Sequence, residues 1–256
     1  MATEERRRRL VVRTCLPEEV TDVHRLLAQG EIVACQAMAW GSNENFLVAV
    51  RADSDPPVLA VYKPQAGEAP LWDFPDGTLY RREYAAYLVS RALGWPAVPP
   101  TVVREGPFGI GTVQLFIPND PKDHYYRFRG QHPADLQRIA LFDLITNNAD
   151  RKPGHCLRSP DGRIWAIDHG LTFNVVPKLR TVIWDFCGDP IPSAILADLR
   201  RLLDDPTVRG PLEEQLRQWL DPREVTVFFQ RVAQTVQRGR FPLLDPHRNV
   251  PRGFWG

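Results

Sequence analysis

Two aspartates in the second half of the chain are spaced so that a short hairpin brings them together. Asp150 lies in a polar loop after a predicted helix, and Asp168 follows a strand predicted over 164–167. The Pro-Asp-Gly sequence at 160–162 predicts a tight turn before that strand, so both carboxylates lie at one end of a β-ribbon. Such a pair suits a bound divalent metal and a hydroxyl group that must lose a proton. We therefore hypothesise phosphoryl transfer from a nucleotide.

A cation is predicted to lie opposite these carboxylates. Lys63 ends a mostly apolar strand predicted over 58–63, and Glu83 lies on the partly apolar side of a helix predicted over 78–93. If this helix packs on the sheet, Glu83 can pair with Lys63 and leave the ammonium directed at phosphate oxygens. The alternative is a solvated Glu83 beside two arginines.

The first half of the chain is predicted to be mainly β. Short apolar runs separated by turn residues predict strands over 32–40, 46–50, 58–63, 101–104 and 110–117, after a short helix over 17–28. The backbone N–H groups of the first turn, Gly41-Ser42-Asn43, are positioned to lie against phosphates, although an ordinary turn is an equal alternative. The Pro-Asn-Asp-Pro sequence at 118–121 ends the β half. The backbone groups of Leu115 to Ile117, just before it, are predicted to be free to hydrogen-bond a flat ligand such as adenine. The alternative is that this region is only a linker between the two halves.

The second half is predicted to be mainly helical. Apolar positions at helical spacing predict helices over 133–147, 192–203, 211–220 and 222–238. Asp143 lies within the apolar face of the first of these, so it needs a hydrogen-bonding partner, which we expect to be backbone of the following loop. The predicted organisation is an N-terminal extension (1–30), a β-rich lobe (31–117), a helical lobe (118–240) and an irregular tail (241–256).

Composition limits the classes of protein. With 256 residues, 43% of them hydrophobic, and a formal net charge of +1, we expect a soluble protein that does not bind nucleic acid through a broad basic surface. The arginines at 6–9 are interpreted as a solvated tail rather than a binding arm. No apolar run approaches the roughly 20 residues of a membrane span, and no signal peptide is evident, so we expect a cytoplasmic protein. None of the four cysteines forms a C-x-x-C pair, and Cys156 is interpreted as a small buried residue rather than a nucleophile.

Several motifs occur in a characteristic order. They are a Gly turn, VLAVYKP (58–64), REYAAY (82–87), VQLFI (113–117), NNADRKPGH (147–155) and IDHGLTF (167–173). In this order they resemble the phosphatidylinositol 3- and 4-kinase-related branch of the protein-kinase-like fold, and are most similar to its small bacterial members and to the type II phosphatidylinositol 4-kinases. The resemblance covers roughly residues 32 to 190. It implies an α+β, bilobal fold with an antiparallel, β-rich N-lobe and a mainly helical C-lobe.

The resemblance also implies a role for each matching residue. Lys63 matches the lysine that holds nucleotide phosphates, and Glu83 the helix acid that steadies that lysine. Asp168 matches the acid that binds Mg²⁺, and Asp150 matches the catalytic-loop acid that receives the proton of the acceptor. Arg151, the next residue of the same motif, is assigned a catalytic role together with Asp150 and Lys63. The implied cofactors are ATP and Mg²⁺.

The resemblance further implies that Gln114, Leu115, Phe116 and Ile117 form the hinge that cradles adenine. One residue departs from the family pattern, because His155 stands where the type II lipid kinases have an asparagine five residues after the catalytic aspartate. Imidazole prefers Mn²⁺ or Zn²⁺ to Mg²⁺, so Mn²⁺ is a possible cofactor, and His155 is interpreted as a ligand of metal or phosphate or as a packed, hydrogen-bonded side chain.

The acceptor is expected to bind near residues 175–192. This region has only two cations, Lys178 and Arg180, which argues against a lipid surface and favours a protein or a small hydroxylated molecule. A kinase-shaped, nucleotide-binding regulatory module without turnover is the alternative, supported by His155, and nucleotidyl transfer is a third reading. The sequence predicts neither an oligomeric state nor a choice between ATP and GTP.

Overall fold

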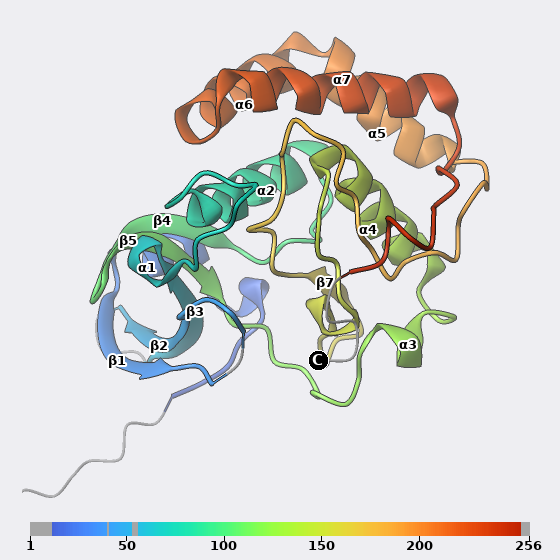
Figure 1. Cartoon of the computed structure of the whole chain (residues 1–256). Helices are drawn as coiled ribbons and strands as arrows, with labels where there is room; N and C mark the ends of the chain where they lie inside the picture. Colours follow the sequence, from blue (N-terminus) through green and yellow to red (C-terminus); the bar gives the residue numbers. More distant parts are fainter. Residues whose placement is uncertain (1–11, 40, 53–55, 252–256) are drawn as a thin grey trace, which may run out of the picture.

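The computed structural model describes residues 12–39, 41–52 and 56–251. Parts of the sequence interpretation lie outside these residues: the arginines at 6–9, the last residue of the strand predicted over 32–40, and the end of the tail from 252. The described chain forms one five-stranded sheet and a group of helices beside it (Figure 1).

The sheet is antiparallel throughout, with the strand order β1-β2-β3-β5-β4. Its strands are β1 (Glu31–Ala37), β2 (Phe46–Arg51), β3 (Val58–Pro64), β4 (Thr101–Gly106) and β5 (Gly109–Leu115). Fully and partly buried residues alternate along β3, as expected for a strand with one face in a core. All five strands were predicted, but β1 ends three residues earlier than expected and β5 two residues earlier.

The N-terminal segment contributes to the core of this sheet. The predicted helix over 17–28 is two short pieces, the 3₁₀ turn η1 (Pro17–Glu19) and the helix α1 (Val23–Gln29). The break arises because the Asp22 carboxylate accepts a hydrogen bond from the Arg25 N–H and so starts a new helix. Val23, Leu26 and Leu27 of α1 then pack with the buried side chains of the sheet.

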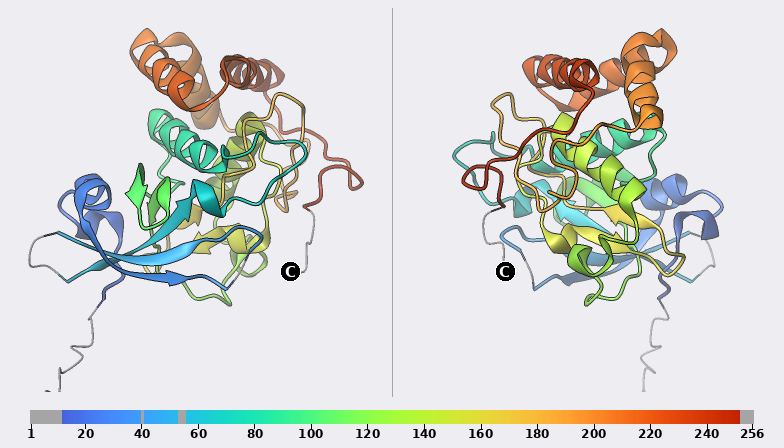
Figure 2. Two further views of the ribbon diagram at one scale, coloured as in Figure 1. Left: turned by 60° about the vertical axis from the view of Figure 1, so that its left-hand side comes forward. Right: turned by 90° about the vertical axis from the view of Figure 1, so that its right-hand side faces the viewer.

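A larger hydrophobic core joins most of the helices. They are α2 (Leu79–Leu93), α3 (Tyr125–Phe128), α4 (Pro133–Thr146), α5 (Ser193–Asp204), α6 (Pro206–Trp219) and α7 (Pro222–Arg238). Figure 2 shows α5 to α7 (orange to red) at the end of the molecule away from β1 and β2 (blue). The buried residues of α2 belong to this core together with those of α4 to α7, although α2 precedes β4 in the chain.

The helix predicted over 211–220 begins earlier than expected. It starts at Pro206, where the Asp205 carboxylate accepts a hydrogen bond from the Thr207 N–H and Pro206 takes the first helical position, which suits proline. Pro211 lies inside the helix and forgoes one backbone hydrogen bond. The predicted helix over 211–220 therefore lacks the first turn and a half of α6.

A small hairpin connects the helical core to the sheet. It consists of β6 (Cys156–Arg158), preceded by the 3₁₀ turn η3 (Pro153–His155), and β7 (Ile164–Ala166). Its turn contains Gly162 at φ +85°, a conformation that favours glycine. The predicted hairpin is therefore confirmed. Within the described part of the chain, no helix is both long and apolar enough to cross a membrane.

We expect Phe228→Ala to destabilise the protein by about 3–5 kcal/mol, because it leaves a cavity in the helical core. Phe228 is fully buried, and its ring centroid lies 5.7 Å from that of Phe173 and 5.0 Å from that of Phe229. Denaturant unfolding measures the change. The control is Gln230→Ala on the exposed side of the same helix, which should change stability by no more than about 0.5 kcal/mol. Equal effects of the two substitutions would contradict this packing.

Candidate active site

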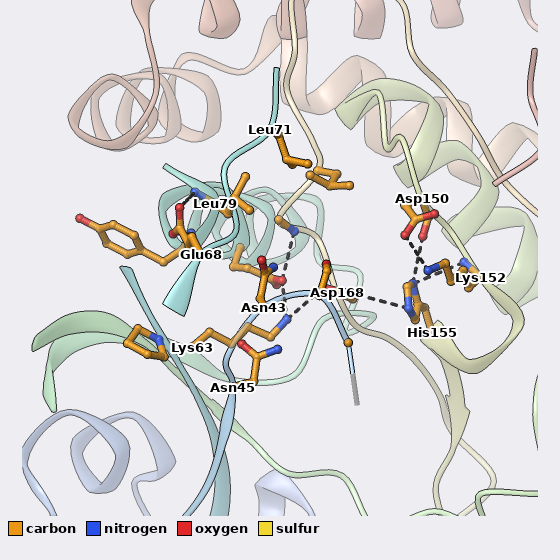
Figure 3. Close-up of a pocket in the computed structure, with 17 residues that line it drawn as sticks. Asn43, Asn45, Lys63, Glu68, Leu71, Leu79, Asp150, Lys152, His155 and Asp168 are labelled. Carbon is orange, nitrogen blue, oxygen red and sulfur yellow. Dashed lines mark hydrogen bonds and ion pairs between the residues drawn. The ribbon is translucent and has the colours of Figure 1, made fainter. Parts of the chain in front are cut away.

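The candidate site is a polar pocket between the sheet, α2 and the turn that follows β7 (Figure 3). Five predicted site residues line it together: Lys63, Glu83, Asp150, His155 and Asp168. The cavity volume is about 180 Å³, below the roughly 300–1,000 Å³ of pockets that enclose a whole drug-sized ligand. The pocket therefore matches the charged end of a ligand rather than an entire nucleotide.

A chain of close polar contacts, two of them ion pairs, runs across the pocket. Lys63 Nζ lies 2.5 Å from Glu83 Oε1 and 3.2 Å from Asp168 Oδ1. His155 Nε2 lies 3.2 Å from the other oxygen of Asp168, Oδ2. Figure 3 shows these contacts in sequence from Lys63 to His155, with Asp150 on the same side as His155. The predicted pairing of Lys63 with Glu83 is present.

Local structure explains why these side chains meet. Lys63 is the last residue but one of β3, where it pairs with Thr112 of β5, so the ammonium is delivered to the end of the sheet. Asp168 has φ +62°, a left-handed conformation that is uncommon for aspartate, at the turn after β7. The Gly170 N–H donates to Glu83 Oε1 (3.1 Å), which ties this turn to α2. Backbone strain of this kind is concentrated at functional sites.

The charges reinforce one another. Burial acts to lower the pKa of Lys63, but the Glu83 and Asp168 carboxylates outweigh it and raise the pKa above the ordinary lysine value. Burial acts to raise the pKa of Asp168, yet Lys63 and His155 hold it well below the ordinary value. At neutral pH the pocket therefore presents a permanent ammonium beside an ionised carboxylate, which is half-exposed.

Asp150 is held by the loop that ends α4. Asn147 closes that helix in the left-handed conformation (φ 56°), and the Asn148 side-chain oxygen accepts a hydrogen bond from the Asp150 N–H (3.0 Å). The carboxylate lies 3.2 Å from Lys152 Nζ. Burial raises the pKa of Asp150, which makes its carboxylate a stronger base.

Arg151 has a different place from the one we predicted. Its side chain is fully buried, and its guanidinium makes five hydrogen bonds, two to Asp143, one each to the His155 and Ile167 carbonyls and one to His169 Nε2. A guanidinium has only five N–H donors, so none is left for a substrate. The catalytic role assigned to Arg151 is therefore wrong. Arg151 instead connects α4, the loop of Asp150 and the turn of Asp168.

The same contacts correct our expectation for Asp143. We expected backbone of the following loop to satisfy its carboxylate, but the partners are the side chains of Arg151 (2.8 and 2.9 Å) and Asn148 (2.8 Å). Because a carboxylate and a guanidinium that are both fully buried compensate each other, the pair is tolerated in the core. His169 accepts from Arg151, so its imidazole is neutral, and its role is structural.

His155 and Asp168 have the donor set of a partial metal site. Burial lowers the pKa of His155 to about 4, so its imidazole is neutral near pH 7. Its Nδ1 lies 3.0 Å from the Asp150 carbonyl oxygen; a proton donated there leaves the Nε2 lone pair facing Asp168 Oδ2. Metal-binding histidines commonly donate their second ring N–H to a carbonyl in this way. These two residues therefore fit a cation between them.

The protein offers no more than part of a coordination shell. Among the described residues, no group of three or more His, Cys, Asp or Glu side chains is arranged to hold a metal. Mg²⁺ typically takes one or two protein ligands and fills its remaining positions with phosphate oxygens and water. The site thus fits a metal that arrives with a phosphate ligand.

The predicted turn Gly41-Ser42-Asn43 also lines the pocket. Gly41 has φ +105°, which explains why glycine occurs there. The Asn43 side-chain oxygen accepts a hydrogen bond from the Ala69 N–H (2.9 Å), which fixes the turn against the loop after β3.

The predicted adenine-binding hinge, residues 114–117, has backbone groups that are hydrogen-bonded within the protein. The N–H of Leu115 donates to the Pro100 carbonyl (2.9 Å) and that of Phe116 to the Leu59 carbonyl (3.1 Å), so these two amides are not free for adenine as we expected. The Gln114 side chain is buried and donates to the Thr101 hydroxyl (2.8 Å), while Ile117 is buried in the sheet core. The N–H groups of Leu115 and Phe116 have partners within the protein because β5 lies between β3 and β4.

Among the pocket residues that were not predicted, three carry an ammonium, amide or carboxylate group: Lys152, Asn45 and Glu68. Lys152 follows Asp150 by two residues, and Asn45 follows Asn43 by two, so sequence proximity was a usable signal for both. Glu68 gave no signal, because it lies in an irregular loop. Its carboxylate accepts hydrogen bonds from the first N–H groups of α2, those of Leu79 (2.9 Å) and Tyr80 (2.8 Å).

Comparison with solved structures defines the fold. The chain is similar to hydra Fam20 with sugar (TM-score 0.59, 15% identity, 87% of this chain and 88% of that one) and to the Golgi casein kinase with Mn/ADP bound (0.54, 17%, 84% and 74%). It is also similar to the Helicobacter pylori proinflammatory kinase CtkA (0.53, 12%, 84% and 94%). The predicted α+β, bilobal protein-kinase-like fold is therefore confirmed.

Sequence comparison gives a partial and a nearly complete match. Phosphatidylinositol 4-kinase gamma 4 of rice (Oryza sativa) is 32% identical over 108 residues, which are 35% of this chain and 19% of the rice protein. No protein-family model matches. Protein Rv2133c of Mycobacterium tuberculosis is 38% identical over 269 aligned residues, 90% of this chain and 94% of the mycobacterial protein. Such identity over almost the full length of both shows that this chain belongs to the same family as Rv2133c.

Proposed function

We propose that this protein is an atypical kinase that transfers the γ-phosphoryl group of ATP, with a divalent metal, to a hydroxyl group of a protein or small molecule. The observation that carries the proposal is the ion-paired cluster of Lys63, Glu83 and Asp168, which shares one pocket with Asp150. Phosphoryl transfer depends on charge neutralisation and in-line positioning, and this pocket supplies the groups for both.

Each side chain has a defined task in this proposal. Lys63, fixed by Glu83, binds phosphate oxygens and offsets their negative charge. The acceptor hydroxyl attacks the γ-phosphorus, the bond from that phosphorus to the oxygen bridging it to the β-phosphate breaks, and Asp150 receives the hydroxyl proton. Lys152, 3.2 Å from Asp150, adds a second cation on the acceptor side. Arg151 acts as a positioning residue beneath these groups.

Asp168 and His155 would hold the divalent cation. When bound, this cation neutralises charge on the phosphate oxygens and orients them. His155 supplies an imidazole nitrogen where the resembling lipid kinases have an amide oxygen, so we propose Mn²⁺ as the preferred ion, with Mg²⁺ also accepted. The Mn and ADP bound to the Golgi casein kinase support this cofactor pair by analogy of fold alone.

The branch of the fold remains part of the proposal. The local identity with the rice phosphatidylinositol 4-kinase supports the resemblance to the phosphatidylinositol 3- and 4-kinase-related branch. His155 also supports the alternative of a nucleotide-binding regulatory module without turnover. ATP labelled separately at the γ and α positions distinguishes the readings: label transferred from γ supports the kinase, label from α supports nucleotidyl transfer, and binding without transfer to any protein or small-molecule acceptor offered supports the module.

We expect Asp168→Asn to weaken metal-dependent ATP binding by about tenfold or more, because the amide removes the anionic ligand. Calorimetry with ATP, in the presence and absence of MnCl₂, measures the loss. The control is Asp161→Asn in the hairpin turn, outside the ion-paired cluster, which should bind as the wild type does. Unchanged metal dependence in Asp168→Asn would contradict the assignment.

Asp150→Asn should leave the Kd for ATP within about twofold and lower the rate of transfer by about 10²–10⁴-fold, the usual contribution of a general base. Label transfer from γ-labelled ATP and a parallel binding titration give the two values. Turnover at the wild-type rate would exclude Asp150 as the base.

His155→Asn replaces the imidazole with an amide oxygen. We expect the ratio of Mn²⁺-supported to Mg²⁺-supported binding of ATP to fall by about tenfold, since the harder ligand favours Mg²⁺. Titrations with both metals measure the ratio. The same ratio in variant and wild type would show that His155 does not bind the metal.

A further inference from the structure

A buried guanidinium lies on the helix next to the pocket. Arg82 of α2 donates to the Thr172 carbonyl oxygen (2.7 Å) and pairs with Glu224 of α7, with 2.7 Å between Nη2 and Oε1. Its carbon Cζ lies 5.0 Å from the ring centroid of Phe74. The side chains of Arg82 and Glu224 are 2% and 11% exposed, so both charges are almost removed from water.

Such burial requires fixed partners. A desolvated charge is tolerated only when an opposite charge and hydrogen bonds compensate it. Glu224 is itself oriented, because its second oxygen accepts a hydrogen bond from the Asp221 N–H at the start of α7 (3.2 Å). The contact between α2 and α7 therefore has a single defined geometry.

Further contacts attach α2 to the C-terminal helices. Tyr84 of α2 meets Trp219 of α6 edge to face, with 5.1 Å between ring centroids. Arg201 of α5 donates to the Ala92 and Leu93 carbonyls (3.0 and 3.1 Å) at the end of α2. Figure 1 shows α6 and α7 lying over α2. The helix that carries Glu83 is thus part of the C-terminal core.

Arg82 and Glu83 are consecutive, and they hold the two ends of one short turn. Glu83 accepts the Gly170 N–H, and Arg82 binds the Thr172 carbonyl. Asp168 lies two residues before Gly170, directly ahead of this segment. We propose that Arg82 and Glu224 are positioning residues: their buried pair sets α2 and the turn of Asp168 in register, so that Glu83 meets Lys63. The effect of this pair on the pocket geometry stands by itself, whereas its effect on catalysis rests on the proposed function.

The first test measures the Lys63–Glu83 pair without nucleotide. Melting temperatures are compared for the wild type, Lys63→Met, Glu83→Gln and the double variant. Lys63→Met leaves the buried Glu83 without its cation, and Glu83→Gln leaves Lys63 with Asp168 alone. The double variant should therefore melt about 3 °C or more above the additive value. The same four proteins are then made in a Glu224→Gln background, where the amide keeps the shape and the helix cap but loses the charge. We expect the departure from additivity to fall by half or more.

The matched control is Glu213→Gln on α6, which breaks an exposed ion pair with Arg217 (2.6 Å) in the same group of helices. It should leave the Lys63–Glu83 coupling unchanged. If the coupling is the same in the Glu224→Gln and wild-type backgrounds, the proposal is overturned, whatever the melting temperature of Glu224→Gln itself. Arg82→Lys should retain part of the coupling, since one ammonium cannot reach Glu224 and Thr172 with the geometry of the planar guanidinium.

The second test uses activity. Glu224→Gln should lower kcat by about tenfold and leave KM for ATP within about twofold, because the phosphates still bind but are held out of line. A purely structural role of Glu224 would lower the melting temperature and leave kcat unchanged, which would also overturn the proposal. If the wild type neither binds nor turns over ATP, the proposed function fails, while the coupling experiment still decides the role of Arg82 and Glu224.

Discussion

The structure depends on one constraint: a charge that leaves water must meet an opposite charge. Three basic side chains satisfy it in different places, Lys63 in the pocket, Arg151 beneath it and Arg82 behind it. Each connects segments that are distant in the chain or belong to different elements. Because removing one partner of such a pair leaves an uncompensated charge, the three pairs fix geometry more than they add stability. The pocket is therefore defined by a network of charges as much as by the hydrophobic core.

The three basic side chains also differ in whether they can contact a ligand. Only Lys63 faces the pocket and keeps its ammonium available to a ligand. Arg151 has every donor engaged and serves to join the loop of Asp150 to the turn of Asp168. Asp150 and Arg151 are consecutive residues of one motif, but they have different positions. Asp150 lines the pocket, whereas Arg151 is buried beneath it.

Much of this arrangement could be predicted from local signals. The strand that ends at Lys63, the helix that carries Glu83 and the hairpin before Asp168 each follow from apolar periodicity and turn residues, which act over a few positions. The fold class followed from the order of the motifs. The meeting of Lys63, Glu83 and Asp168 in one pocket could therefore be predicted from the sequence.

Side-chain partners and exact boundaries were not foreseeable in the same way. Asp143 pairs with Arg151 rather than with loop backbone. The N–H groups of Leu115 and Phe116 donate to neighbouring backbone carbonyls. Both sets of partners depend on tertiary contacts, which local sequence patterns do not encode. Glu68 caps α2 from a loop with no regular pattern. Nor did the position of α2 before β4 reveal that it packs with helices more than 100 residues later.

The packing of α2 with the later helices has a consequence for the pocket. Since α2 is built into the C-terminal core, the helix that carries Glu83 belongs to one hydrophobic core and the strand that carries Lys63 belongs to the other, the core of the sheet and α1. The contact between Lys63 Nζ and Glu83 Oε1 therefore bridges the two cores, and a change in the distance between them acts directly on the charge balance of the pocket.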